Sequence, residues 1–278
     1  MMDDKRIEMP TALGIGGPVT QVTKARGGRV YELGHVEGKP QVPSVTSIID
    51  GAVRNFGLEV WRKQHIERGL QNHSGEVLTT DAINRIMSAS SDEAETSAAL
   101  GSTLHNIIEA LLRGEEVIVP DQLEPAVEGF RKWREAFSHW DLAGTEVTVY
   151  DLRSHKHTQL GYAGTVDALW KSPGKNGTHD YIVVDWKTSS GIYPSALMQV
   201  AAYANALSRM LGNDTHVSGM VVRFVNDYPR VAGKKDRSQP KIFSSGVEYA
   251  WANHIDGFNA CLHIHQANKA RVYPETIA

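Results

Sequence analysis

The chain has 278 residues, a formal net charge of −3 and a hydrophobic share of 41%, which is typical of globular proteins and not of disordered or strongly basic ones. The single cysteine, Cys261, excludes an internal disulfide and a four-cysteine zinc or iron–sulfur site. No stretch approaches the roughly 18 apolar residues of a membrane helix, and residues 1–10 lack the apolar core of a secretory signal. We therefore expect a cytoplasmic protein with no membrane partner.

The N-terminal third of the chain predicts a lead-in followed by helices. Residues 1–28 are rich in glycine and polar side chains, which indicates a loose segment. The run Arg29–Leu33 predicts a short strand, and Pro43 and Ser44 before an apolar run mark the start of a helical region. Residues 71–97 are polar, so we expect short helices around a mobile crossing there.

The remainder of the chain alternates between helical and strand patterns. Apolar residues at helical spacing predict two amphipathic helices, at 97–113 and 122–140. Strands are predicted next, at 145–150, 161–170 and 181–186, with a hairpin turn before the last. A helix, a strand and a closing helix follow, at 194–211, 217–225 and 246–270. This order predicts an α/β fold in which helices flank a central mixed β-sheet, preceded by an N-terminal helical extension.

An ionisable pair ends the predicted strand 181–186. Because strand side chains alternate between faces, Asp185 and Lys187 project to the same side. Burying them at the end of an apolar strand is costly unless something compensates their charges, as a bound cation and a phosphate substrate would. Taken alone, the pair is more typical of an edge strand that runs into solvent.

A second carboxylate lies in the neighbouring strand. The hairpin turn brings Asp167 beside Asp185, and two carboxylates a few ångströms apart repel unless a hard cation lies between them. Mg²⁺ prefers such oxygen ligands. Taken alone, Asp167 also fits a turn or capping residue.

Two further pairs stand four residues apart on predicted helices. His105 and Glu109 share one face of the helix before the sheet, and Gln199 and Tyr203 share one face of the helix after the Asp185 strand. Neither pair alone predicts a function. A histidine on an amphipathic helix is usually structural, and a glutamine four residues before a tyrosine is not a specific pattern.

Together, the ordered motifs resemble the RecB-like branch of the PD-(D/E)XK nucleases over about residues 97–225. They are His105 with Glu109, Gly164-Thr-Val-Asp167, Asp185-Trp-Lys187, and Gln199-x-x-x-Tyr203. The upstream segment around Arg29, Pro43–Ile49 and Trp61 also resembles the Cas4-like and mitochondrial genome maintenance exonuclease group. Because the iron–sulfur cysteines of many Cas4-like proteins are missing, the plainer exonucleases, including phage ones, fit better.

The resemblance implies a metal centre. It implies that Asp167 and Asp185 bind Mg²⁺ or Mn²⁺, that His105 completes the ligand shell, and that the Trp186 carbonyl is a further ligand. Glu109 then acts through a water molecule or supports the ligands from behind.

The resemblance also implies roles for three residues beside the metal. Lys187 positions and activates the attacking water and offsets the negative charge that develops on phosphorus. Gln199 and Tyr203 hold the lysine or the DNA backbone.

The implied fold is a restriction-endonuclease-like core in a single nuclease domain, with residues 1–96 as lead-in and helical arch and residues 97–278 as core and C-terminal helix. The implied function is a DNA exonuclease acting on free ends, on single strands, in phage or bacterial replication, recombination or repair. A replication or recombination protein is an expected partner. Two alternatives stay open: a structure-specific or restriction-like endonuclease, and a catalytically silent DNA-binding relative.

Basic residues give candidates for DNA contact. Arg62 and Lys63 with the aromatic Trp61 suit a single strand passing under an arch, and Arg223 is a candidate beside the sheet. The sequence contains three basic clusters that could contact DNA: Arg62, Lys63 and Arg68; Arg131, Lys132 and Arg134; and Lys234, Lys235, Arg237 and Lys241. Each is also typical of a solvated helix face or loop.

Overall fold

The structure is a computed structural model. It describes residues 5–7, 19–23, 28–53, 56–75, 77–152, 154–155, 158–159, 161–174, 179–212, 215–235 and 241–269.

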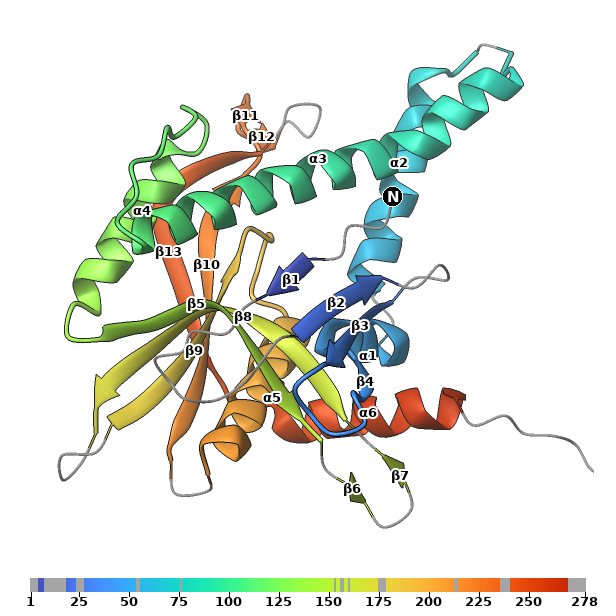
Figure 1. Cartoon of the computed structure of the whole chain (residues 1–278). Coiled ribbons are helices and arrows are strands. Elements are labelled where there is room, and N and C mark those ends of the chain that lie inside the picture. Colours follow the sequence, from blue (N-terminus) through green and yellow to red (C-terminus); the bar gives the residue numbers. More distant parts are fainter. Residues whose placement is uncertain are drawn as a thin grey trace, which may run out of the picture.

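A five-stranded sheet forms the centre of the molecule (Figure 1). Its strand order is β13-β10-β9-β8-β5, with bounds Ile242–Ala252, Val217–Asp227, His179–Lys187, Tyr162–Pro173 and Asp141–Asp151. Strands β5, β8 and β9 are antiparallel, β10 runs parallel to β9, and β13 is antiparallel to β10. The predicted α/β class and mixed sheet are therefore confirmed.

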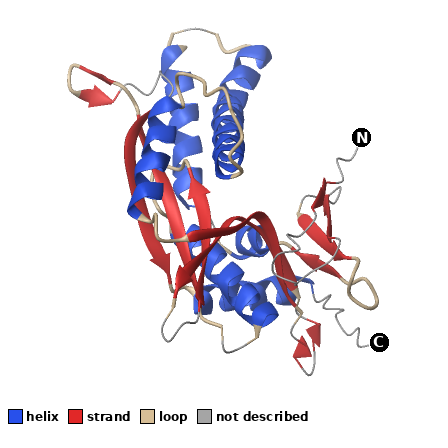
Figure 2. Cartoon of the chain, turned by 60° about the vertical axis from the view of Figure 1, so that its left-hand side comes forward, coloured by secondary structure: helices blue, strands red, loops and turns tan. Residues whose placement is uncertain are grey.

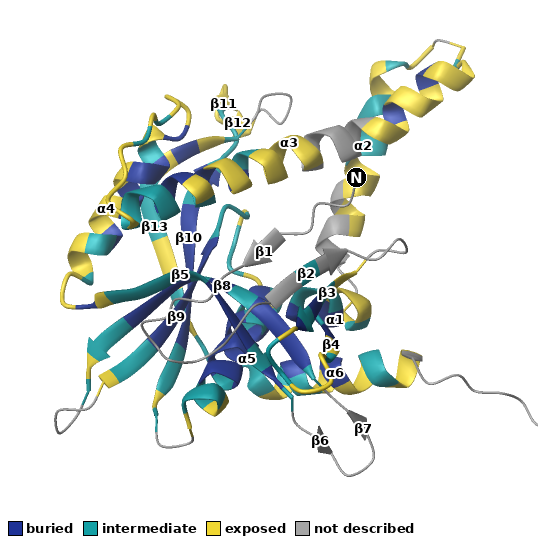
Figure 3. Cartoon of the chain, viewed as in Figure 1, coloured by how far each residue is buried: buried dark blue, intermediate teal, exposed yellow. Residues whose placement is uncertain are grey.

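Helices cover both faces of this sheet (Figure 2). One face packs against α1 (Val45–Ala52), α5 (Pro194–Leu211) and α6 (Ile255–Lys269). The other packs against α3 (Thr80–Leu112) and α4 (Glu124–Ala136). The strands are buried between the two apolar layers (Figure 3), and burial of apolar area is what holds the three layers together.

Helix α5 makes the crossover between the parallel strands β9 and β10. The missing side chain at Gly219 of β10 allows a close approach, since a Cβ there would lie 2.5 Å from Val200 Cγ1 of α5. Helix α1 begins where the sequence predicted, because Ser44 caps it by accepting a hydrogen bond from Ser47 N at 3.0 Å.

The predicted closing helix 246–270 is wrong in its first part. Residues up to Ala252 belong to β13, and α6 begins only at Ile255. Val247, Tyr249 and Trp251 favour strand, and β10 offers them an unpaired edge, so tertiary pairing decides the conformation.

The expected mobile crossing at 71–97 is also wrong. Helix α2 (Phe56–Asn72) ends in a turn, and α3 then runs without a break for 33 residues. Thr79 caps α3 by accepting from Ala82 N at 3.2 Å, and no glycine or proline interrupts the helix before Gly101. The two helices form an arm that projects beyond the sheet (Figure 1).

The two helices of the arm pack closely near the turn that joins them. A Cβ at Gly69 of α2 would lie 2.7 Å from Cγ2 of Ile86, and Ile86 of α3 is buried. A small residue at Gly69 thus brings the two helices into contact.

Residues 1–28 are not uniformly loose. They contribute β1 (Lys5–Ile7) and β2 (Val19–Thr23) to a small sheet of order β1-β2-β3-β4, with β3 at Arg29–Leu33 and β4 at Gln41–Pro43. Residues 1–4, 8–18 and 24–27 lie outside the described part. Two short hairpins complete the fold: β6–β7 (Ser154–His155, Thr158–Gln159) and β11–β12 (Arg230–Val231, Lys234–Lys235).

Among the helices that the structure describes, none combines the length and the apolar character needed to cross a membrane.

The continuity of α3 can be tested at Ala98, an exposed position inside it. We expect Ala98→Pro to cost about 3 kcal/mol or more and Ala98→Gly only about 1 kcal/mol, because proline removes a backbone hydrogen bond and clashes with the preceding turn. Far-UV circular dichroism and proteolysis of the arm measure the effect. Equal, small effects of both variants would restore a break near Ser97.

Candidate active site

The candidate site lies where two neighbouring strands part. Strands β8 and β9 are paired from Pro173↔His179 to Ala168↔Val184, and the described pairing stops one residue before Asp167 and Asp185. Beyond that point the Trp186 N–H donates to Asp167 Oδ2 at 2.8 Å instead. The predicted proximity of the two aspartates is therefore observed.

A chain of polar contacts links Asp185 to helix α5. Lys187 Nζ lies 2.6 Å from Asp185 Oδ2, and Gln199 Nε2 donates to Asp185 Oδ1 at 2.9 Å. The same amide lies 3.1 Å from the Tyr203 hydroxyl, which accepts from it. The Asp185 side chain is 2% exposed and that of Lys187 is 26% exposed, so the lysine is the group that reaches solvent.

His105 comes to the site from the opposite layer. Its Nδ1 lies 3.5 Å from Asp167 Oδ2. Helix α3 approaches closely because Gly101 faces the loop after Lys187, where a Cβ would lie 2.9 Å from Thr188 Oγ1. Side chains from α3, α5, β8 and β9 thus converge on one point.

The electrostatics of the site show a shortage of positive charge. Burial, followed by the nearby Asp185 carboxylate, raises the pKa of Asp167 to about 6, although His105, Lys187 and the Trp186 N–H act against this. Burial alone would lower the pKa of Lys187, but the two carboxylates outweigh it and raise that pKa. The lysine therefore stays charged, while Asp167 is a carboxylate that takes up a proton readily.

Tyr203 is buried under β8. A Cβ at Gly164 would lie 2.1 Å from Tyr203 Cε1, so only glycine leaves room for the ring. Burial raises the pKa of Tyr203 well above its ordinary value, and the phenol stays neutral.

Sequence reasoning missed two neighbours of the site. Tyr31 of β3 contacts Thr165 through their hydroxyls at 3.0 Å, two residues before Asp167. Glu146 of β5 has φ 50°, and the pairs on either side of it place it opposite Asp167. A non-glycine residue with positive φ is uncommon, and β5 is distorted there beside the carboxylate. No local sequence pattern marks these positions, because they depend on strand register.

Glu109 has partners other than the two aspartates. It forms an ion pair with Arg113 one turn further along α3, and its Oε1 accepts from Thr145 Oγ1 at 3.4 Å. Glu109 therefore fixes α3 against β5 in this structure.

The indole of Trp186 points away from the site. It is buried and lies edge-on to Phe130 and Trp133, with ring centroids at 5.7 and 5.0 Å. Only its backbone is available to the site: the N–H donates to Asp167, and the carbonyl is the predicted ligand atom.

The residues expected to contact DNA differ in their exposure and in their partners. Arg62 and Lys63 are exposed on α2, with Lys63 paired to Glu67 at 3.7 Å. The side chain of Trp61 lies outside the described part of the structure. Arg223 is buried and holds the loop after Lys187, with Nε donating to Ser189 O at 2.7 Å and Nη1 2.6 Å from Glu248.

The other basic clusters also differ. Arg134 of α4 donates to the carbonyls of Phe137 and Trp140, which is a structural role. Arg131 and Lys132 are half-exposed and pair with glutamates of their own helix. Lys235 and Lys241 line a pocket, and Arg237 lies outside the described residues.

The donor set fits a hard divalent cation. Asp167, Asp185 and His105 offer carboxylate oxygens and an imidazole nitrogen, which Mg²⁺ and Mn²⁺ accept. These donors contact each other and Lys187, and the described residues form no ready cluster of three metal-ligating side chains. A cation at Asp185 Oδ2 would compete with the Lys187 ammonium. The raised pKa of Asp167 supports the fit, since added positive charge is what the pair lacks.

Comparison with known proteins adds little to this geometry. No family model and no curated protein matches the chain. One solved structure, titled "Crystal structure of SSO0001", aligns with 76% of this chain and 85% of its own at 15% identity and a TM-score of 0.35, a likeness too low to support any argument.

The charge imbalance predicts a stabilising substitution. The pKa of Asp167 is about 6 when folded, against about 3.9 for an unfolded aspartate, so the folded chain binds the proton more tightly and stability falls as pH rises between these values. We expect Asp167→Asn, without divalent cations, to raise the free energy of unfolding at pH 8 by about 1–3 kcal/mol and by almost nothing below pH 3.5. Urea titrations at both pH values measure this.

Asp180→Asn is the matched control, because Asp180 lies on β9 and is 39% exposed. It should leave stability nearly unchanged. A destabilised Asp167→Asn at pH 8 would contradict the assignment of excess negative charge to this site.

Proposed function

We propose that this protein is a Mg²⁺- or Mn²⁺-dependent deoxyribonuclease, an exonuclease that hydrolyses phosphodiester bonds from DNA ends. The observation that carries the proposal is the convergence of Asp167, Asp185 and Lys187 at the parting of β8 and β9. The cationic groups around the two carboxylates do not balance their negative charge. A bound metal ion would add the missing positive charge, and a substrate phosphate would bind to that ion.

The proposed mechanism assigns each residue one task. Asp167, Asp185 and His105 would hold the cation, which supplies Lewis-acid activation of water and of the scissile phosphate when bound. Lys187 keeps its proton and directs its ammonium at the oxygens that gain negative charge in the transition state.

Two buried neighbours position these groups. The Gln199 amide fixes the Asp185 carboxylate by donating to Oδ1, and the neutral Tyr203 phenol accepts from the same amide. Both act through Asp185 and are positioning residues in this proposal.

The choice of an exonuclease over an endonuclease rests on the motif resemblance. The ordered arm of α2 and α3 removes the argument for a mobile arch over a threaded strand. The proposed substrate is DNA, single-stranded or with free ends, in a cytoplasmic setting of replication, recombination or repair.

Catalytic variants test the assignment of the metal site and the lysine. Asp167→Asn, Asp185→Asn and Lys187→Ala should each lower kcat for a DNA oligonucleotide in Mg²⁺ by about 10²–10⁴-fold, because each removes charge that acts in the transition state. Lys171→Ala, on the same sheet, is the control and should stay within twofold. Wild-type-like cleavage by Lys187→Ala would remove its catalytic role.

The need for a DNA end is tested with matched substrates. In Mg²⁺, linear single-stranded DNA should be degraded while a closed circle of the same sequence survives. Rapid cleavage of the circle would favour the endonuclease instead. Absence of cleavage on both, with DNA still bound, would favour a catalytically silent DNA-binding protein.

A further inference from the structure

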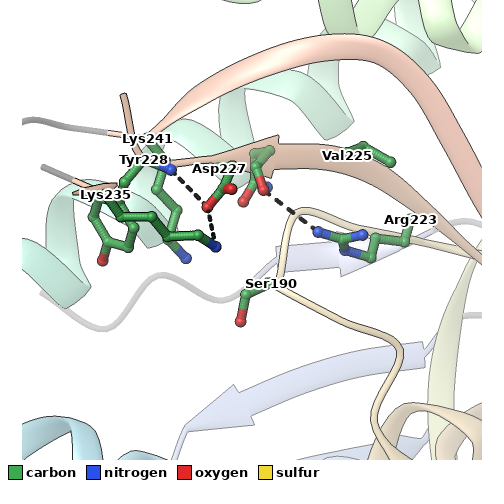
Figure 4. Close-up of a pocket in the computed structure, with 8 residues that line it drawn as sticks. Ser190, Arg223, Val225, Asp227, Tyr228, Lys235 and Lys241 are labelled. Carbon is green, nitrogen blue, oxygen red and sulfur yellow. Dashed lines mark hydrogen bonds and ion pairs between the residues drawn. The ribbon is translucent and has the colours of Figure 1, made fainter. Parts of the chain in front are cut away.

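A pocket adjoins the end of the strand that carries Lys187. Its volume is about 360 Å³, and the lining side chains that matter here are Ser190, Arg223, Asp227, Tyr228, Lys235 and Lys241. Figure 4 shows the two lysines and Tyr228 on one side of this space and Arg223 on the other, with Ser190 from the loop between them.

The pocket and the candidate active site are linked through strands β9 and β10 and the loop after Lys187. Arg223 of β10 pairs in register with Lys187 of β9, and neighbouring strands lie about 4.8 Å apart. Arg223 Nε donates to Ser189 O, and Asn226 Nδ2 donates to Thr188 O at 2.6 Å. The loop that leads from Lys187 into the pocket wall is therefore fixed by hydrogen bonds from β10.

The pocket lining is cationic. The charge of Arg223 is matched by Glu248 at 2.6 Å, so the lining carries the two lysine charges of Lys235 and Lys241 against the carboxylate of Asp227. Asp227 Oδ1 lies 2.8 Å from Lys235 Nζ and also accepts from Tyr228 N at 2.9 Å, which orients the lysine. An ammonium has three donors, so Lys235 retains capacity for a phosphate oxygen while paired with Asp227.

An aromatic ring completes the lining. The Lys241 ammonium lies 5.3 Å from the centroid of the Tyr228 ring, within cation–π range. Cations that track phosphates together with a ring on which a base stacks are the two elements of single-strand recognition. A structural role for the exposed Lys235–Asp227 pair explains less, because such pairs contribute little to stability.

We propose that this pocket binds one nucleotide of the DNA strand beside the scissile phosphate. Lys235 and Lys241 contact its backbone phosphate, and its base stacks on the face of Tyr228 opposite the Lys241 ammonium. The proposal rests on the proposed nuclease function and names a binding subsite for its substrate.

The test uses the full-length protein with a single-stranded DNA oligonucleotide. Lys235→Ala combined with Lys241→Ala should raise KM at least fivefold with kcat within twofold, and should weaken binding in Ca²⁺ by the same factor. The slope of log affinity against log salt should become shallower by about one, as lost phosphate contacts require. Tyr228→Ala should weaken binding about tenfold and Tyr228→Phe should restore it.

Lys234→Ala is the matched control, because Lys234 is an exposed neighbour on the same hairpin outside the pocket lining. It should change neither KM nor affinity by more than twofold. Circular dichroism of each variant reports on folding.

The outcomes separate the two proposals. Cleavage by wild type with unchanged KM and affinity in the double variant overturns the pocket and leaves the nuclease standing. If wild type does not cleave, the nuclease proposal fails and binding alone decides the pocket: a loss specific to the double variant supports it, and equal affinity overturns it. A loss as large in Lys234→Ala also overturns it, since general charge then explains binding.

Discussion

Two carboxylates from neighbouring strands, Asp167 and Asp185, share a small, mostly buried volume. The other groups of the site reduce the repulsion between them. The Asp185 carboxylate pairs with the Lys187 ammonium and accepts a hydrogen bond from Gln199, while Asp167 accepts from the Trp186 N–H and lies beside His105. These contacts do not fully compensate for burial and for the neighbouring Asp185 carboxylate, which together keep the pKa of Asp167 raised to about 6. A fold keeps such an arrangement against its cost in stability when the site needs the charge for another partner.

Helices on both sides of the sheet bring side chains to the two aspartates. Helix α5, the crossover between the parallel strands, carries Gln199 and Tyr203 to one face, and α3 carries His105 from the other layer. Both can reach the same point only because β8 and β9 separate after Ala168↔Val184. The glycines at positions 101 and 164 then allow α3 and Tyr203 to come close. The opening between the strands is thus a consequence of packing, and in the proposed function it is where the substrate phosphate would bind.

The sequence predicts which candidate site residues lie together where the strand or helix periodicity places chemically suitable side chains on one face. Asp185 and Lys187 share a strand face, Gln199 and Tyr203 share a helix face, and a hairpin turn brings Asp167 beside Asp185. Features that depend on tertiary contacts could not be predicted in this way. Strand β13 forms because β10 offers an edge, and Tyr31 and Glu146 reach the site through register. The second half of α3 is predicted at 97–113, but its first half is not, because that polar part lacks an apolar stripe although its residues favour helix. The partners of Arg223 could not be predicted from the sequence either, because they come from the loop after Lys187 and from β13.

The most direct test of this account is the position of a bound Mn²⁺ ion, determined by anomalous diffraction from crystals soaked in Mn²⁺. One ion is expected at about 2.1–2.3 Å from carboxylate oxygens of both Asp167 and Asp185. His105 is expected in the coordination shell, with the Lys187 ammonium moved away from Asp185 Oδ2. An ion bound elsewhere, or no ion between the two aspartates at millimolar Mn²⁺, would contradict the central claim that their shared charge exists to hold a metal.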